Sequence, residues 1–396
     1  MKCCFVPALI TGMENPVKQI VQHPETNRFG YYADKYDPSW FTDRAMFFHP
    51  EMLVSYYYSG KIPDYRKRLT IRDDVRLWAD SGGYSIFTQG GTINPKDVLS
   101  WQEKNANIAF SLDIPPAASF NTTRCSPGKV VYYGLDKFEK NAIQSHQNNV
   151  DFQTLRTSDQ LKIYNVIHGY NRETLNLWYD YVTDGIQFEG YATGTKPTHN
   201  ILLQAMCVMY LWSRGIRERV HLLGVAGINV IPVLVWMSQY VDKISFDSTS
   251  YGYGSRTRAY MLPNNIKYYT HFGRKYLVKK NRLTTLNCPC PICQHVKTVD
   301  FFCESNITWP GMLISLHNLW LVQKYVQDLN DALHTEKNIT KFNALVKQHT
   351  GRAADDCFHA IHFVEDVVKM GYNKAYDLYF ADHDINKQKF EQKRLF

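Results

Sequence analysis

The side chains of this sequence that could move protons or attack a substrate stand at regular positions, each at or just after a short β-rich run. Carboxylates and an imidazole can act as acids, bases or nucleophiles, and glycines let a ligand approach the backbone closely. The residues at these run ends are Asp80, Asp113, His168, Gly194, Gly227 and Asp247. Such regular placement indicates one site that is assembled from several strand ends.

A second group of reactive side chains has the spacing C-x-C-x2-C, followed later by a histidine. Three thiolates and one imidazole suit tetrahedral Zn²⁺, and four protein ligands make the site structural because no coordination position stays open. His295 and Cys303 compete for the fourth position. The expected ligands are Cys288, Cys290, Cys293 and His317.

Short β-rich runs alternate with amphipathic stretches along most of the chain, which predicts parallel strands joined by crossover helices. The expected strands are Arg76–Asp80, Ile108–Asp113, Ile163–Gly169, Gly185–Ala192, His221–Gly227 and Lys243–Asp247. The expected helices between them are Pro95–Asn105, Arg172–Thr183, Thr198–Arg214 and Val230–Tyr240. Two weaker runs, Phe5–Leu9 and Leu53–Tyr57, would complete eight strands.

Eight such units predict a (β/α)8 TIM barrel, in which the C-terminal ends of the strands meet at one mouth. A doubly wound open sheet is the alternative, but it would gather only the residues near its switch point. We expect the barrel over residues 1–285, an inserted zinc-binding subdomain over 286–320, and a C-terminal helical segment that packs on the barrel over 321–396. After the cysteine cluster, Ser315–Leu333 and Ala354–Phe380 show helical apolar spacing.

Composition narrows the class of protein. With 396 residues, 44% hydrophobic and only 21% charged, the chain can bury a large core, and we expect disorder only at its ends. The apolar run Val230–Met237 is far shorter than the ~20 residues of a membrane span. Nine unevenly spaced cysteines fit a reducing, cytoplasmic compartment better than a disulfide framework. The net charge of +8 permits a nucleic-acid partner without requiring one.

Six motifs resemble those of the tRNA-guanine transglycosylases, occur in that family's order, and cover roughly residues 75–320. The first is similar to the family's Asp-Ser-Gly-Gly-Phe/Tyr signature, and the second to the strand whose Asp binds the substrate. The third and fourth are similar to its Gly-Tyr-Ala-Ile-Gly motif and its Leu-Met-Gly-Val strand. The fifth is similar to the Phe-Asp strand that carries the nucleophile. The sixth is the cysteine cluster with its later histidine. In this chain the five are Asp80-Ser-Gly-Gly-Tyr84, Leu112-Asp113, Gly190-Tyr-Ala-Thr-Gly194, Leu222-Leu-Gly-Val225 and Phe246-Asp247.

The chain also departs from the members that act on tRNA. Ser85-Ile86 stands where they carry Gln, Asp113-Ile-Pro115 where they carry Asp-Glu-Cys, and Ile167-His168-Gly169-Tyr170 where they carry Val-Gln-Gly-Gly. These differences resemble the DNA-acting branch of phages and bacteria, which inserts 7-cyano-7-deazaguanine or a relative into DNA. The resemblance therefore implies a guanine transglycosylase acting on DNA.

The resemblance assigns roles to the strand-end residues. Asp247 would attack C1′ of the sugar and form a covalent intermediate, while Asp80 would shuttle the proton of the departing and incoming bases. Asp113 would accept hydrogen bonds from the guanine edge, and Tyr84 and Leu223 would sandwich the base. As alternatives, Asp80 before Ser-Gly-Gly also suits a turn or a helix cap, and Tyr84 and Leu223 also suit the barrel core.

Further positions are expected around the base and the nucleic acid. Gly194 and the N–H of Thr195 would let the backbone approach O6 of the base closely. Lys196 or His168 would contact the nitrile or the sugar-phosphate, although His168 also fits a structural role. The remaining substrate-binding residues are Gly82, Gly83, His168, Gly194, Thr195, Lys196 and Gly224. The expected nucleic-acid contacts, or alternatively a solvated basic face, are Arg256, Arg258, Arg274, Lys275, Lys279, Lys280 and Arg282.

Three functions stay open at this point. The first is exchange of guanine in DNA for a 7-deazaguanine, and the second is the same chemistry on tRNA. The third is a catalytically inactive barrel that serves as a binding subunit, against which the presence of both Asp80 and Asp247 argues. The partners are accordingly DNA or tRNA and a 7-deazaguanine base, with structural Zn²⁺ and no membrane, and the oligomeric state is open.

Overall fold

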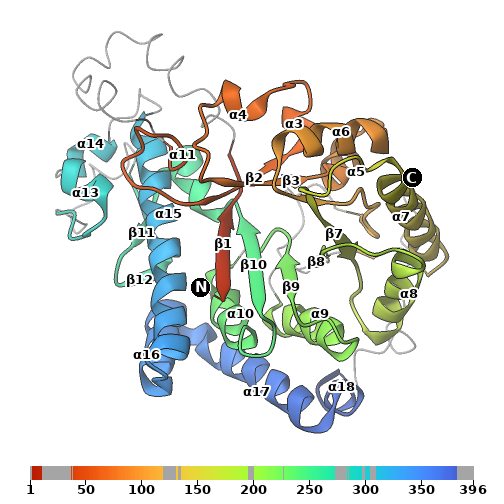
Figure 1. The fold of residues 1–396 in the computed structure, drawn as a ribbon. Helices are drawn as coiled ribbons and strands as arrows, with labels where there is room; N and C mark the ends of the chain where they lie inside the picture. Colours follow the sequence, from red (N-terminus) through yellow and green to blue (C-terminus); the bar gives the residue numbers. More distant parts are fainter. Residues whose placement is uncertain are drawn as a thin grey trace, which may run out of the picture.

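Eight parallel strands form a barrel in the computed structural model of the protein (Figure 1). The structure describes residues 2–10, 37, 39–118, 131–132, 135–194, 200–225, 227–272, 283, 285–296, 299–303 and 309–380. The barrel strands are β1 (Cys3–Pro7), β2 (Glu51–Ser55), β3 (Arg76–Asp80), β4 (Ile108–Phe110), β7 (Lys162–Ile167), β8 (Gly190–Thr193), β9 (Arg219–Leu222) and β10 (Lys243–Ser248). From β2 to β10 each barrel strand pairs with the next along the chain, and β1 pairs with β10. A parallel bridge between Ala8 and Leu53 joins the β1 and β2 ends, so the (β/α)8 prediction is confirmed.

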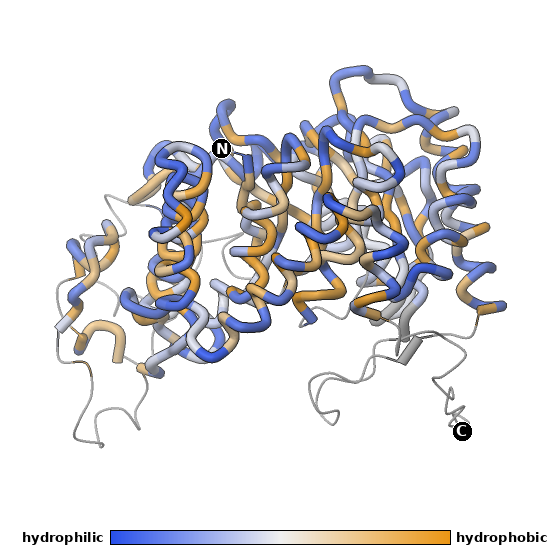
Figure 2. Tube along the Cα trace, turned by 90° about the horizontal axis from the view of Figure 1, so that it is seen from below, coloured by the Kyte–Doolittle hydropathy of each residue, from blue (hydrophilic) through white to orange (hydrophobic). Residues whose placement is uncertain are grey.

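The barrel interior is filled by side chains, as alternation along each strand requires. Every second residue of a strand points inward and meets its counterparts from the other strands. The apolar residues that pack there are Val6, Ala8, Leu53, Trp78, Ile108, Phe110, Tyr164, Val166 and Ala192. Figure 2 shows hydrophobic stretches gathered within the body of the molecule and hydrophilic turns at its rim. The interior is therefore a packed core beneath the mouth, which holds the strand ends in fixed positions.

Helices follow most of the strands and cover the barrel from outside (Figure 1). They are α3 (Tyr56–Ser59), α4 (Tyr65–Arg68), α5 (Gly83–Gln89), α6 (Pro95–Asn105), α7 (Leu135–Leu155), α8 (Arg172–Thr183), α9 (Ile201–Ser213) and α10 (Ile231–Met237). The bounds of α6 and α8 equal the predicted ones because both begin at clear caps, Asn94 and Asn171. The predicted strand Gly185–Ala192 starts too early, since Gly185 lies in a turn with φ 65°.

The C-terminal helices pack on the barrel, and they explain why two barrel helices are apolar all round. These helices are α16 (Ile339–Thr350), α17 (Ala354–Met370) and α18 (Tyr372–Phe380). They cover α9 and α10, whose sequences ILLQAMCVMYLWS and IPVLVWM leave almost no residue for solvent. The stretch Ala354–Phe380, which showed helical apolar spacing, forms two helices that are divided at Gly371 with φ 89°.

An insertion follows the last barrel strand and precedes the last barrel helix. It contains α11 (Tyr253–Thr257), an antiparallel hairpin of β11 (Ala259–Leu262) and β12 (Asn265–His271), α13 (Pro291–Val296) and α14 (Val299–Cys303). The chain then returns to the barrel as α15 (Trp309–Asn330), which packs beside β1 and α10. The expected domain boundary at residue 320 falls inside α15, because this helix serves both the insertion and the barrel. A two-stranded pair, β5 (Ala117–Ala118) and β6 (Val131–Tyr132), lies after β4.

Candidate functional site

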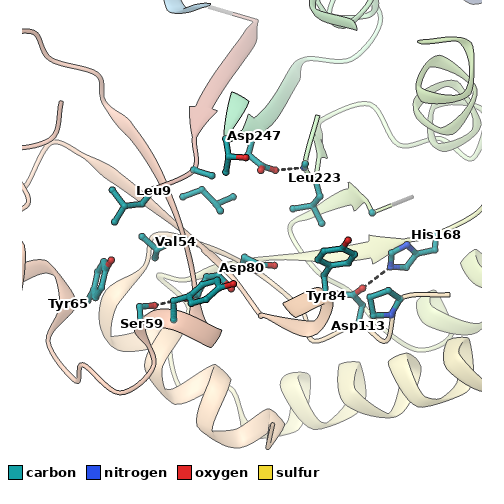
Figure 3. Close-up of a pocket in the computed structure, with 18 residues that line it drawn as sticks. Leu9, Val54, Ser59, Tyr65, Asp80, Tyr84, Asp113, His168, Leu223 and Asp247 are labelled. Atoms are coloured by element: carbon teal, nitrogen blue, oxygen red, sulfur yellow. Dashed lines mark hydrogen bonds and ion pairs between the residues drawn. The ribbon is translucent and has the colours of Figure 1, made fainter. Parts of the chain in front are cut away.

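One pocket of about 280 Å³ opens among the C-terminal ends of the barrel strands (Figure 3). Each barrel strand, or the segment directly after it, supplies at least one residue to its lining. The predicted site residues in this lining are Asp80, Tyr84, Asp113, His168, Gly194, Leu223, Gly224 and Asp247. The fold therefore brings together three carboxylates and an imidazole that are far apart in the sequence.

The turn after β3 fixes Asp80 and explains the two glycines that follow it. Gly82 adopts φ 83°, and its N–H donates to Oδ2 of Asp80 over 3.2 Å. A Cβ at Gly82 would lie 2.9 Å from the backbone nitrogen of Tyr57, and a Cβ at Gly83 would lie 2.4 Å from the carbonyl oxygen of Asp113. Both glycines are thus needed for the close approach of neighbouring strand ends, and neither lines the pocket itself.

The surroundings of Asp80 make its carboxyl group less acidic than usual. Its pKa is raised from the usual 3.8 to about 6, chiefly because burial penalises the charged form. The negative charges of Asp113 and Asp247 act in the same direction, while the nearby Ser55 hydroxyl and the hydrogen bond from Gly82 partly oppose it. Near neutral pH this group can therefore both give and take a proton.

Asp247 is held by one of its two carboxylate oxygens. Its Oδ1 accepts a hydrogen bond from the backbone N–H of Gly224 over 2.8 Å, and the imidazole Nε2 of His221 lies 3.2 Å from the same oxygen. Gly224 has φ 63°, so the turn after β9 can aim its N–H at the end of β10. Asp247 itself is only 7% exposed and faces the pocket (Figure 3).

The sequence analysis did not identify His221 as a site residue, although its position in a predicted strand could have indicated it. It is fully buried inside the barrel, two residues before Leu223 on the same face of the chain. Alternation along the strand would have pointed its ring inward beneath the pocket. Its link to Asp247 depends on the pairing of β9 with β10, which places His221 opposite Ser245, and that register is not visible in the sequence.

Asp113 and His168 form a buried pair at another wall of the pocket. Nε2 of His168 lies 2.7 Å from Oδ2 of Asp113, and because a carboxylate only accepts, this nitrogen carries the proton. The His168 ring packs edge-on against Trp178 at 4.7 Å. A Cβ at Gly194 would lie 2.4 Å from Cε1 of His168, so the glycine makes room for the imidazole.

The pocket wall continues beyond the predicted residues. Tyr84 is 38% exposed at the mouth, and Leu223 lies across from it in the same half of the pocket (Figure 3). Most of the other lining residues lie after β1, in β2 or after β2, and two more follow β4 and β10. These additional lining residues are Ala8, Leu9, Leu53, Val54, Ser55, Tyr58, Ser59, Tyr65, Pro115 and Thr249.

The predicted nucleic-acid residues are only partly described. Arg256 is exposed on α11, whereas Arg258, at the end of α11 with φ 55°, is half-buried near Cys303, and burial lowers its pKa. Neither arginine lines the pocket. Of the remaining predictions, Thr195, Lys196, Arg274, Lys275, Lys279, Lys280 and Arg282 lie outside the described residues.

The predicted metal ligands also come together, at a distance from the pocket lining. The ligand atoms of Cys288, Cys290, Cys293 and His317 lie within 4.8 Å of one another, and all four residues are buried. This group could hold a metal ion. The fourth ligand beside the three cysteines is His317 of α15. The two alternatives for this position, His295 and Cys303, do not belong to the group.

Local structure prepares the His317 ring to act as a ligand. Its Nε2 lies 2.9 Å from the carbonyl oxygen of Met261 and donates to it, so Nδ1 keeps its lone pair. Nδ1 lies 3.2 Å from Sγ of Cys290 and 3.4 Å from Sγ of Cys293. The ring of Tyr260 stacks on the imidazole at 3.8 Å, which fixes its orientation. The ring is thus held ready to complete, with the three sulfurs, a group of four donors that could hold a metal ion.

Fold and site together define a (β/α)8-barrel protein with an acidic pocket at its mouth and a buried Cys3His group in an insertion. Comparison with models of known protein families and with curated proteins finds no match for this chain. Within the described part of the chain, no helix combines the length and the apolar character that crossing a membrane would need.

Proposed function

We propose that this chain is a guanine transglycosylase of the tRNA-guanine transglycosylase superfamily, of the branch that replaces guanine in DNA by a 7-deazaguanine. The observation that carries the proposal is the meeting of Asp80 of β3, Asp113 after β4 and Asp247 of β10 in one pocket. Base exchange with retained configuration needs a nucleophile, a proton shuttle and a recognition group for the base. Three separate carboxylates in different environments can supply these three roles.

Asp247 is the nucleophile in this account. A carboxylate oxygen forms a bond to C1′ of the nucleotide while the C1′–N9 bond breaks, and the bond electrons leave with guanine. Asp80, present partly as the acid because its pKa is about 6, gives its proton to the departing guanine. The incoming base then gives its N9 proton to Asp80, N9 bonds to C1′, and the ester bond to Asp247 breaks.

Asp113 selects the base. Its Oδ2 is engaged by His168, and its carboxylate lies at the pocket wall where N1–H and the 2-amino group of guanine or a 7-deazaguanine can donate to it. Adenine presents a different edge and would leave the carboxylate with the donor from His168 but without the two donors of guanine, which costs binding free energy. Tyr84 and Leu223, on opposite sides of the same half of the pocket, would hold the base between them.

Zinc is the metal that best fits the Cys3His group, with Cys288, Cys290, Cys293 and His317 as its ligands. Four protein ligands leave no position for substrate, so the ion would hold the insertion against α15 and take no part in base exchange. The target nucleotide must leave its stack to reach the barrel mouth, where exposed Arg256 could meet neighbouring phosphates.

The experiment is a base-exchange assay with the full-length protein. Purified protein is incubated with radiolabelled guanine, or labelled 7-cyano-7-deazaguanine, together with duplex DNA or tRNA. Label in DNA but not in tRNA is the expected result. Label in tRNA alone would contradict the DNA assignment, and label in neither polymer would contradict the enzymatic function and favour a binding subunit. The variant Asp247→Asn serves as the matched control, since its amide oxygen can still accept from Gly224.

A further inference from the structure

We infer that His221, oriented by Ser245, is a positioning residue that decides which oxygen of Asp247 bonds to the sugar. The inference rests on the proposed function, because it refines the role of Asp247 as nucleophile. None of the motifs in the sequence includes either residue. Both are buried inside the barrel directly beneath the pocket, at paired positions of β9 and β10.

The His221 ring is fixed from all sides. It is fully buried and lies against two aromatic rings, with centroids 4.9 Å away for Trp78 and 4.8 Å for Phe110. Its Nδ1 lies 2.9 Å from Oγ of Ser245, and its Nε2 lies 3.2 Å from Oδ1 of Asp247. A ring that bridges two polar groups within an apolar barrel cannot turn without losing both hydrogen bonds.

The protons follow from what each group can do. The ionised carboxylate of Asp247 only accepts, so Nε2 of His221 must carry a proton to bond it. With a single proton on the ring, Nδ1 is an acceptor, and the hydroxyl of Ser245 donates to it. Ser245 therefore donates a hydrogen bond to His221, and His221 donates one to Asp247.

This arrangement makes the two oxygens of Asp247 unequal. Oδ1 receives donors from His221 and from the backbone N–H of Gly224, whereas no donor to Oδ2 is found in the described part of the chain. The lone pairs of Oδ2 are therefore the ones available to C1′. In the ester intermediate Oδ1 becomes the carbonyl oxygen and keeps both hydrogen bonds. When the ester bond breaks again, the same two donors stabilise the returning negative charge.

The kinetic test compares His221→Phe, which fills the space without a donor, with His221→Gln, which can place an N–H near the position of Nε2. Release of labelled guanine from duplex DNA is followed in a single turnover. We expect His221→Phe to slow this step roughly 10- to 100-fold with little change in affinity for free guanine, and His221→Gln to recover most of the rate. Ser245→Ala should fall between wild type and His221→Phe. Equal rates for wild type and His221→Phe, or no recovery in a folded His221→Gln, would overturn the inference.

A second measurement does not depend on activity. Long-range ¹H–¹⁵N spectra of ¹⁵N-histidine-labelled protein report which ring nitrogen carries the proton, and the His221→Gln spectrum identifies the signals of His221. We expect protonated Nε2, with signals that shift in Asp247→Asn. A ring protonated on Nδ1 alone would overturn the inference even if base exchange occurs. Conversely, a wild-type protein that exchanges no base but shows the expected ring state would refute the proposed function and leave the geometry of His221 and Asp247 established.

Discussion

Gly83 lies so close to Asp113 that a Cβ at residue 83 would stand 2.4 Å from the carbonyl oxygen of Asp113. Real Cβ atoms do not approach a backbone atom so closely, so only glycine fits at residue 83. The segments that follow β3 and β4 are in direct contact at this point. The contact holds the carboxylates of Asp80 and Asp113 at one wall of the pocket. It also explains why helix α5 begins with a glycine at residue 83, where alanine would otherwise be the better helix former.

The first prediction concerns this contact. Gly83→Ala should destabilise the protein by about 1–3 kcal/mol, because the new methyl group must push β3 and β4 apart. Binding of guanine should weaken at the same time, since Asp113 moves. Gly227→Ala is the matched control, because the atom nearest to a Cβ at residue 227 lies 4.0 Å away. This substitution should leave the unfolding free energy nearly unchanged. Denaturant unfolding of both variants checks this, and equal stability of the two would contradict the stated contact.

The second prediction concerns the pH dependence of stability at Asp80. The pKa of Asp80 in the folded protein, about 6, lies above its usual value of 3.8. The protonated carboxyl group therefore contributes stability that is fully present below about pH 4 and is lost as the pH rises through 6. Asp80→Asn should therefore raise the unfolding free energy at pH 7.5 by about 1–3 kcal/mol, and this gain should shrink toward pH 4. Thermal unfolding across this range measures it. A variant less stable than wild type at pH 7.5 would refute the proposed acidity of Asp80.

The third prediction concerns base selection by Asp113. Asp113→Asn should weaken binding of free guanine by roughly 10- to 100-fold, because a charged acceptor is replaced by an amide that presents one acceptor and one donor. Binding of adenine should stay weak in both proteins. Isothermal titration with the two bases checks this, and unchanged guanine affinity would exclude Asp113 as the recognition group.

The fourth prediction concerns the Cys3His group. The purified protein should contain about one zinc ion per chain, and Cys290→Ser should lose the metal and unfold at a lower temperature. Cys303→Ser is the control, since Cys303 is buried in the same insertion but lies outside the ligand group. Metal content by mass spectrometry decides the outcome. Retention of zinc by Cys290→Ser, or its loss from Cys303→Ser, would refute the ligand assignment.

Much of this architecture was predictable from the sequence, for physical reasons. Strands such as Arg76–Asp80 are short apolar runs between polar ends, and helices such as Arg172–Thr183 begin at a clear cap. Parallel strands joined by helices then leave few possible folds. Strand-end placement then predicted that Asp80 and Asp247 share a pocket. The metal ligands were predictable because the spacing of three of them is local.

Other features depend on tertiary register, which the sequence does not display. The pairing of His221 with Ser245 across β9 and β10 decides that a histidine supports Asp247. Similarly, Gly194 was expected to admit the base, whereas its missing Cβ makes room for His168. The apolar half of the pocket, including Leu9 and Val54, comes from strands that have no chemistry-bearing residue at their ends.

The most direct test of the proposed nucleophile is to trap the covalent intermediate and locate it. The protein is incubated with duplex DNA in the absence of free 7-deazaguanine, denatured in acid, digested, and examined by peptide mass spectrometry. We predict a deoxyribose adduct on Asp247 that is absent from Asp247→Asn and formed more slowly by Asp80→Asn. An adduct on any other residue, or one that persists in Asp247→Asn, would contradict the account.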